Sequence, residues 1–184
     1  MKQNAFYEMF VNQLRSLYDG ENQIIDFFPK VITASSNSEF KESIEDYLEE
    51  SKNQLARLKN IFKILNENPT GSLSKGIRGL IEECQETIDS PTSPVVKDAC
   101  LIICCQKINH YGIAAYGSAR AIAHHLNNIG NNSVDFDAIA DILQQNLDEE
   151  ASLNELLTDI AEGGFFTDGV NDDAEKEATK ETHF

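Results

Sequence analysis

Apolar residues recur every three or four positions along most of the chain, which is the spacing of one face of an α-helix. The pattern predicts four long helices, from about 4 to the low thirties, from the capping box at 36–39 to about 65, over 94–127 and over 136–162, and one short helix over about 73–88. Signals for β-strands are almost absent. The sequence therefore predicts an all-α fold.

Capping residues and helix breakers mark most of these boundaries. They are the capping box Ser36-Asn37-Ser38-Glu39, the stretch NENPTGS at 66–72, Ser93 followed by Pro94, Asp135, and Gly163 with Gly164. Pro29 lies inside the first long helix and is expected to kink it or to end its regular part.

The order of the helices indicates their packing. Two helical hairpins joined by a long connection that carries the short helix are typical of a four-helix bundle with a crossover, which lets the hairpins stack with a parallel pair. The predicted domain covers residues 1–164. Residues 165–184 contain six acidic residues against two lysines and no apolar stripe, so they are expected to form a flexible acidic tail, with Phe165 and Phe166 as the residues that could dock.

The formal net charge of −16 repels phosphate backbones and anionic lipid, which argues against nucleic-acid binding and against membrane-surface binding. No apolar run approaches the ~18 residues of a transmembrane helix, and the amino terminus is polar where a signal peptide is apolar. We therefore expect a cytoplasmic protein. The four cysteines lack the spacing of a disulfide framework, and small core residues are favoured over a soft-metal or thiol redox site: Cys84, Cys100, Cys104 and Cys105.

Polar residues interrupt the apolar stripe of every long helix near its middle. In chain order they are Glu21; Glu50 and Gln54; Gln106 with Asn109 or His110; and Glu150 with Asn154. A buried carboxylate is costly unless it is paired or bound to a cation, and bundle interiors carry such groups mainly as ligands of a metal pair. The open alternative is that a register error of one or two residues puts some of these groups at the rim. The tyrosines on the same stripes are expected to be core residues with a satisfied hydroxyl.

Five segments resemble the YciE/YciF family of ferritin-like bacterial stress proteins, in the right order and spacing. They are LRSLYDGENQIIDFFPK (14–30), YLEESKNQLARLKNIF (47–62), GLIEECQETI (79–88), QKINHYGIAAYG (106–117) and LDEEASLNELLTDIA (147–161). The resemblance covers about residues 5–162. It implies a ferritin-like bundle that commonly pairs as a dimer, an association with stress responses, and a bound pair of metal ions.

This chain departs from the family pattern at several of the positions that would hold the metals. The histidine of the second helix is Tyr47, both carboxylates of the third-helix Glu-His-Tyr-Glu are replaced, by Asn109 and Gly112, and the last-helix acid is Asn154. The glutamates that remain are Glu21, Glu50, Glu149 and Glu150. The resemblance thus implies a centre that has lost about three negative charges.

Two hypotheses follow. Two adjacent Fe²⁺ or Mn²⁺ ions need several carboxylates, whereas amides can satisfy a remaining carboxylate without any metal. In the first hypothesis the metal site is degenerate, and the protein is a non-enzymatic structural or interaction protein without a cofactor. It forms a homodimer, and the sequence does not identify any other protein that it binds. Its polar core network contains Gln54, Gln106, Asn109 and Asn154 beside the remaining acids. In the alternative an iron- or manganese-binding, oxidase-like protein uses a reduced ligand set: Glu21, Glu50, His110, Glu149 and Glu150.

Overall fold

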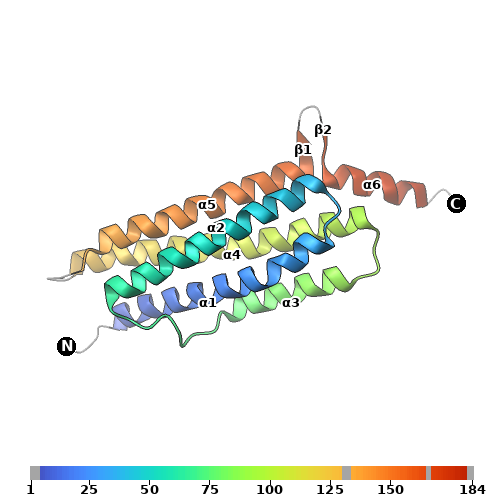
Figure 1. The fold of residues 1–184 in the computed structure, drawn as a ribbon. Coiled ribbons are helices and arrows are strands. Elements are labelled where there is room, and N and C mark those ends of the chain that lie inside the picture. The colour runs from blue at the N-terminus through green and yellow to red at the C-terminus, as the bar shows by residue number, and fades with distance from the viewer. Residues whose placement is uncertain (1–4, 130–133, 165–166, 182–184) are drawn as a thin grey trace.

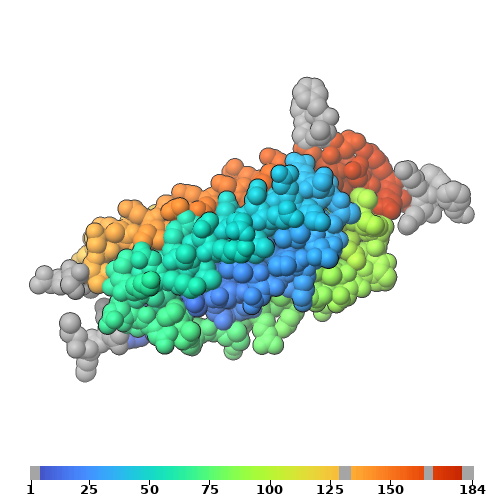
Figure 2. All heavy atoms as spheres, viewed as in Figure 1, coloured from blue at the N-terminus to red at the C-terminus, as the bar shows by residue number. Residues whose placement is uncertain are grey.

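The computed structural model describes residues 5–129, 134–164 and 167–181. Four long helices lie side by side along one axis: α1 (Ala5–Ala34), α2 (Ser38–Leu65), α4 (Pro94–Ile129) and α5 (Phe136–Glu162) (Figure 1). A short helix, α3 (Lys75–Asp89), packs against α1 and α4. The predicted four-helix bundle with an extra helix between two hairpins is confirmed. Figure 2 shows the same elongated body with all heavy atoms drawn, and side chains fill the space that separates the ribbons of α1 and α2 in Figure 1.

The helix ends follow the capping signals with one correction. Asn37, not Ser36, caps α2: its Oδ1 accepts from the Phe40 amide at 2.9 Å. The Ser36 hydroxyl instead donates to Asp98 at 2.5 Å, so it is not available as the cap of a capping box. α1 contains Pro29 and continues regularly to Ala34, so the proline does not end the helix.

Neighbouring long helices in the bundle run antiparallel. The hydrogen bonds Tyr116–Glu21 and Ser36–Asp98 fix this direction for α1 and α4. Because α1 is antiparallel to both α2 and α4, α2 and α4 run in the same direction, which is the direction that the crossover carrying α3 allows. The expected parallel pair therefore exists across the diagonal of the bundle and not between adjacent helices.

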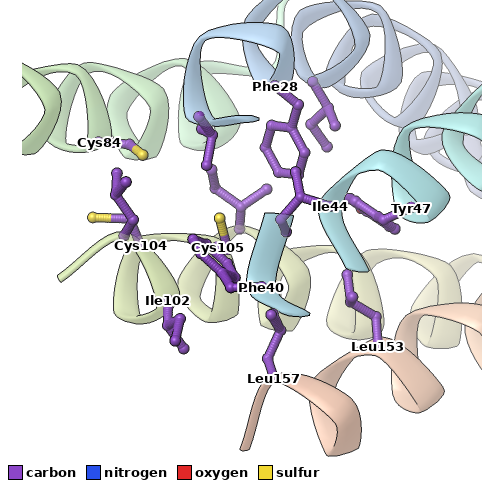
Figure 3. Packing of buried hydrophobic residues seen from close by; sticks show 14 of the residues in the cluster. Phe28, Phe40, Ile44, Tyr47, Cys84, Ile102, Cys104, Cys105, Leu153 and Leu157 are labelled. Carbon is purple, nitrogen blue, oxygen red and sulfur yellow. The ribbon is translucent and has the colours of Figure 1, made fainter. Parts of the chain in front are cut away.

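The bundle interior consists of two apolar clusters separated by a polar layer. One cluster contains Phe28, Phe40, Ile44 and Leu157 (Figure 3), and the other is at the opposite end. The second cluster includes Phe10, Leu14, Leu58, Phe136 and Leu143. The buried polar residues between the clusters are Glu21, Ser51, Gln54, Asn109, Asn146 and Glu150. Each long helix thus contributes polar side chains at mid-height.

The carboxyl-terminal segment contains more structure than its composition indicates. After α5, the strands β1 (Gly163–Gly164) and β2 (Thr167–Asp168) pair antiparallel, and α6 (Val170–Glu181) packs against α4 and α5. Val170 is buried in an apolar cluster, and the Ser93 hydroxyl donates to Glu177 at 2.8 Å. This differs from the flexible acidic tail expected for residues 165–184. Phe165 and Phe166 lie outside the described residues.

Within the part of the chain that the structure describes, none of the helices is both long enough and apolar enough to cross a lipid bilayer.

Candidate metal centre

The polar layer at mid-bundle is where the metal ligands were expected. Glu21 of α1 and Glu150 of α5 are 4% and 1% exposed, and Asn109 of α4 and Gln54 of α2 are completely buried. Their helix registers put them inward because each lies on the stripe that carries the neighbouring core residues. Two carboxyl groups are therefore almost completely removed from water.

Glu150 is held by donors from two other helices. The Asn109 amide donates to Glu150 Oε2 at 2.7 Å and to the Glu150 backbone carbonyl at 2.8 Å, and the Tyr47 hydroxyl donates to Oε1 at 3.0 Å. Burial raises the pKa of Glu150 well above its usual range, and the nearby charge of Glu21 raises it further, against the hydrogen bonds, which lower it. Tyr47 and Asn109 occupy two positions at which the family pattern has a histidine and a glutamate, residue types that bind metal ions.

Glu21 is bound from one side only. The Tyr116 hydroxyl donates to its Oε1 at 2.7 Å, whereas Oε2 has no hydrogen-bond partner among the described residues. Burial raises the pKa of Glu21 to about 7, although the hydrogen bond from Tyr116 lowers it. Glu21 and Glu150 both line a cavity of about 10 Å³, which has room for about one water molecule. Ile77 of α3 and Tyr111 of α4 complete part of its wall.

Gly112 makes room for the Glu150 carboxyl group. A Cβ atom at residue 112 would lie 2.8 Å from Glu150 Oε2 and 3.0 Å from its Cδ, closer than Cβ atoms normally approach. Glu150 therefore occupies space that any larger residue at 112 would take. A glutamate at this position, as in the family pattern, requires Glu150 to adopt another conformation.

Glu149 pairs with a cation of the protein itself. Arg57 Nη1 donates to Glu149 Oε1 at 2.9 Å, and Arg57 Nη2 forms an ion pair with Oε2. The Gln54 amide also donates to Glu149 Oε2, at 3.2 Å. Within the described residues Glu50 forms no side-chain hydrogen bond or ion pair, and it is half-buried; burial first and Glu149 second raise its pKa.

The structure brings only some of the predicted residues together. Glu21, Glu150, Asn109 and Gln54 belong to the central layer. Of the two residues that the spacing left open, Asn109 faces inward, and the His110 side chain is on the exposed face of α4. Three more predicted residues lie outside the layer. Glu50 is at its rim, Gln106 donates to Thr158 at 3.0 Å, and half-buried Asn154 bonds to neither carboxylate.

Sequence reasoning missed two buried members of the layer. Asn146 is completely buried one turn before Glu150, and Ser51 is completely buried one turn after Tyr47. Asn146 follows Leu143 by three positions and precedes Glu150 by four, so helical spacing was a signal that could have found it. The expectation for the tyrosines is confirmed for Tyr47 and Tyr116, whose hydroxyls bond to the two carboxylates.

Comparison with known proteins identifies the family. The family described as Domain of unknown function (DUF892) matches residues 5–175. The chain belongs to this family. A DUF892-type relative, Protein YciF of Escherichia coli (strain K12), is 29% identical over 179 residues, which are 97% of this chain and 100% of YciF. The resemblance noted in the sequence is therefore confirmed.

Two solved structures extend the DUF892 comparison to the fold. The crystal structure of the E. coli stress protein YciF matches with a TM-score of 0.77 and 30% identity, covering 86% of this chain and 94% of that chain. YcfI from Rhodopseudomonas palustris, for which a structural role has been proposed, matches with a TM-score of 0.79 and 32% identity, covering 87% and 97%. The helical architecture is thus shared across the aligned length.

Proposed function

We propose that this protein is a non-enzymatic structural or interaction member of the stress-associated YciF group, and that its central polar layer is stable without a metal pair. The observation that carries the proposal is that Asn109 and Tyr47 donate hydrogen bonds to Glu150. An N–H or O–H group directed at a carboxylate oxygen occupies one of the two lone pairs of that oxygen, and it satisfies the carboxylate without a metal ion.

The balance of charge supports the same proposal. Two adjacent divalent cations in a low-dielectric interior need several anionic ligands to offset their charge. Here Glu21 and Glu150 are the acids of the buried layer, and Arg57 already neutralises Glu149. This donor set does not fit a pair of dications.

Burial raises the pKa of both acids, so the layer can also balance its charge by protonation and not only by a cation. A bound cation stabilises the ionised form of a carboxyl group, whereas burial without a cation favours the protonated form. A protonated Glu21 or Glu150 carries no charge and adds a hydroxyl donor, so the layer needs no external ion.

A second candidate function, binding of one Fe²⁺ or Mn²⁺ ion, has one observation in its favour. Glu21 Oε2 is buried without a partner among the described residues, and Glu21 and Glu150 line the same small cavity. The exposed His110 does not contribute to such a site, which leaves carboxyl, hydroxyl and amide oxygens as its side-chain ligands. This ligand set lacks the imidazole of His110, which the iron- or manganese-binding hypothesis from the sequence included.

Elemental analysis of protein purified from its native host, followed by Fe²⁺ titration with O₂ consumption, tests both candidates. We expect substoichiometric metal and no oxidation of Fe²⁺ beyond the buffer rate. Two iron or manganese ions per chain would overturn the proposal, and one ion per chain would support the second candidate. The homodimer expected from the resemblance stays a prediction, which sedimentation velocity tests.

A double variant sharpens this experiment. Asn109→Glu with Gly112→Glu restores the two third-helix carboxylates, and Glu150 must move away from residue 112 because of the 2.8 Å contact. We expect metal uptake in this variant only. His110→Glu is the matched control, because it adds a carboxylate next to the same positions but on the exposed face.

A further inference from the structure

The interface between α3 and α4 places two cysteines of different helices opposite each other. The antiparallel register is fixed by Glu83, whose carboxylate pairs with Lys107 at 2.9 Å, and by Thr87, whose hydroxyl is 3.5 Å from Cys104 Sγ. Cys84 and Cys104 belong to the same buried cluster at this interface, and a hydrogen bond between the two thiols contributes to the pKa shifts of both. Figure 3 shows Cys84 on α3 above Cys104 on α4.

The surroundings of the two sulfur atoms are unequal. The hydrogen bond from Cys84 is the largest of the effects that lower the pKa of Cys104 to about 6, and the Thr87 hydroxyl and the Lys107 ammonium group act in the same direction against burial. The same hydrogen bond and burial raise the pKa of Cys84. The lowered pKa favours the thiolate at Cys104, which is the nucleophilic form, beside a Cys84 thiol whose raised pKa favours the neutral form.

The other two cysteines differ from this pair. Burial raises the pKa of Cys105, which is completely enclosed in the apolar cluster. Cys100 is half-buried one turn before Cys104 on α4. Cys104 thus combines a lowered pKa with a thiol partner on another helix.

We propose that Cys84 and Cys104 form a dithiol pair that a small hydroperoxide oxidises to a disulfide linking α3 to α4. The Cys104 thiolate attacks the terminal peroxide oxygen, which keeps its proton, the O–O bond breaks, and the leaving oxygen takes a proton from solvent and departs as an alcohol, or as water from hydrogen peroxide. Cys104 is then a sulfenic acid. The Cys84 sulfur attacks the Cys104 sulfur, the S–O bond breaks, and the hydroxide leaves with the Cys84 proton as water. Two thiols lose two electrons, which reduce the peroxide.

The position of the pair gives this disulfide a structural consequence. α3 lies over the central cavity, where Ile77 forms part of the wall beside Glu21 and Glu150. A bond between Cys84 and Cys104 ties the carboxyl-terminal part of this helix to α4. Oxidation would hold α3 over the polar layer, whether or not that layer binds an ion.

Peptide mapping after oxidation tests the proposal on the full-length protein. Reduced protein receives one equivalent of hydrogen peroxide, free thiols are alkylated, and a non-reducing digest is analysed by mass spectrometry. We expect a linked peptide pair containing Cys84 and Cys104, two alkylatable thiols fewer per chain, and no cross-link between chains. Four alkylated thiols after peroxide, a dominant bond to Cys100, or bonds between chains would overturn the proposal.

Two single variants locate the reaction. In Cys84→Ser, the Cys104 sulfenic acid lacks its resolving thiol, so we expect dimedone to label Cys104. Cys100→Ser is the matched control and should form the Cys84–Cys104 bond as the unmodified protein does. Failure of Cys84→Ser to fold, monitored by circular dichroism, leaves the mapping of the unmodified chain as the deciding result.

Discussion

The Asn109 amide donates to both the side chain and the backbone of Glu150, at 2.7 Å to Oε2 and 2.8 Å to the carbonyl oxygen. One residue of α4 therefore binds one residue of α5 in two places inside the bundle. A carboxylate at 109 would repel ionised Glu150 unless a cation lay between them, whereas an amide attracts it directly. The identity of residue 109 is thus tied to how the layer balances its charge.

Asn109→Leu should destabilise the fold by about 1–3 kcal/mol, because it leaves a buried carboxyl group without one of its donors. Urea unfolding followed by circular dichroism measures the change. His110→Ala is the control: its side chain is exposed, and we expect an effect within about 0.5 kcal/mol. Equal losses in the two variants would show that the hydrogen bond to Glu150 contributes little.

The stability of the protein should fall as pH rises from about 4.5 to about 7. Burial raises the pKa of Glu21 in the folded state from its ordinary 4.5 to about 7, so between these values the folded state binds more protons than the unfolded state. Stability therefore decreases with pH through this range, by up to about 3 kcal/mol for this one group. Glu150 acts in the same direction.

Glu21→Gln should reduce that slope, because glutamine cannot ionise and its carbonyl oxygen can still accept from Tyr116. Urea midpoints measured at intervals between pH 4.5 and 7.5 give the comparison. Glu42→Gln, on an exposed position of α2, should leave the slope unchanged. A variant Glu21→Gln with the slope of the unmodified protein would assign the pH dependence to other groups.

The sequence predicted the helices well because period and capping agree along most of the chain. It could not decide between Asn109 and His110, since neighbouring residues on an α-helix point about 100° apart and both fitted the stripe within its uncertainty. The structure turns Asn109 inward and His110 outward. Only the packing of α4 against the helices around it, which are α1, α3, α5 and α6, determines that rotation.

The carboxyl-terminal helix was missed for a different reason. α6 is anchored mainly by a single buried apolar residue, Val170, at its first position, and by the hydrogen bond between Ser93 and Glu177. A single anchor produces no repeating stripe, and the high acid content is typical of a solvated segment. Such docking depends on tertiary contacts that a periodic pattern does not encode.

Asp98→Asn should cost about 1.5–3 kcal/mol, because Asp98 joins the turn between α1 and α2 to the start of α4. Its buried carboxylate accepts from the backbone amides of Ser36 and Asn37, at 3.0 and 2.7 Å, and from the Ser36 hydroxyl. The amide group of asparagine would direct donors at donors. Thermal unfolding measures the loss, and Asp159→Asn, at an exposed position of α5, should change little.

Two glycines of α3 offer a matched test of how this helix is held over the polar layer. A Cβ atom at Gly76 would lie 2.4 Å from Tyr111 Cε2, whereas one at Gly79 would have nothing within 4 Å. Gly79→Ala should therefore stabilise the protein by about 0.5–1 kcal/mol through helix propensity alone. Gly76→Ala gains the same propensity but forces the ring or the helix to move, and we expect a net loss of about 1–2 kcal/mol.

Because the two alanine variants share the helix, the residue type and the substitution, their difference isolates the contact of α3 with Tyr111. Chemical unfolding gives both stabilities, and hydrogen exchange over residues 75–89 reports whether α3 opens more often. Opposite signs in stability, with faster exchange in Gly76→Ala only, would show that close approach at Gly76 keeps α3 on the bundle. Equal stabilisation in both variants would mean that the Tyr111 ring moves aside freely, and that α3 is held by its other contacts with α1 and α4.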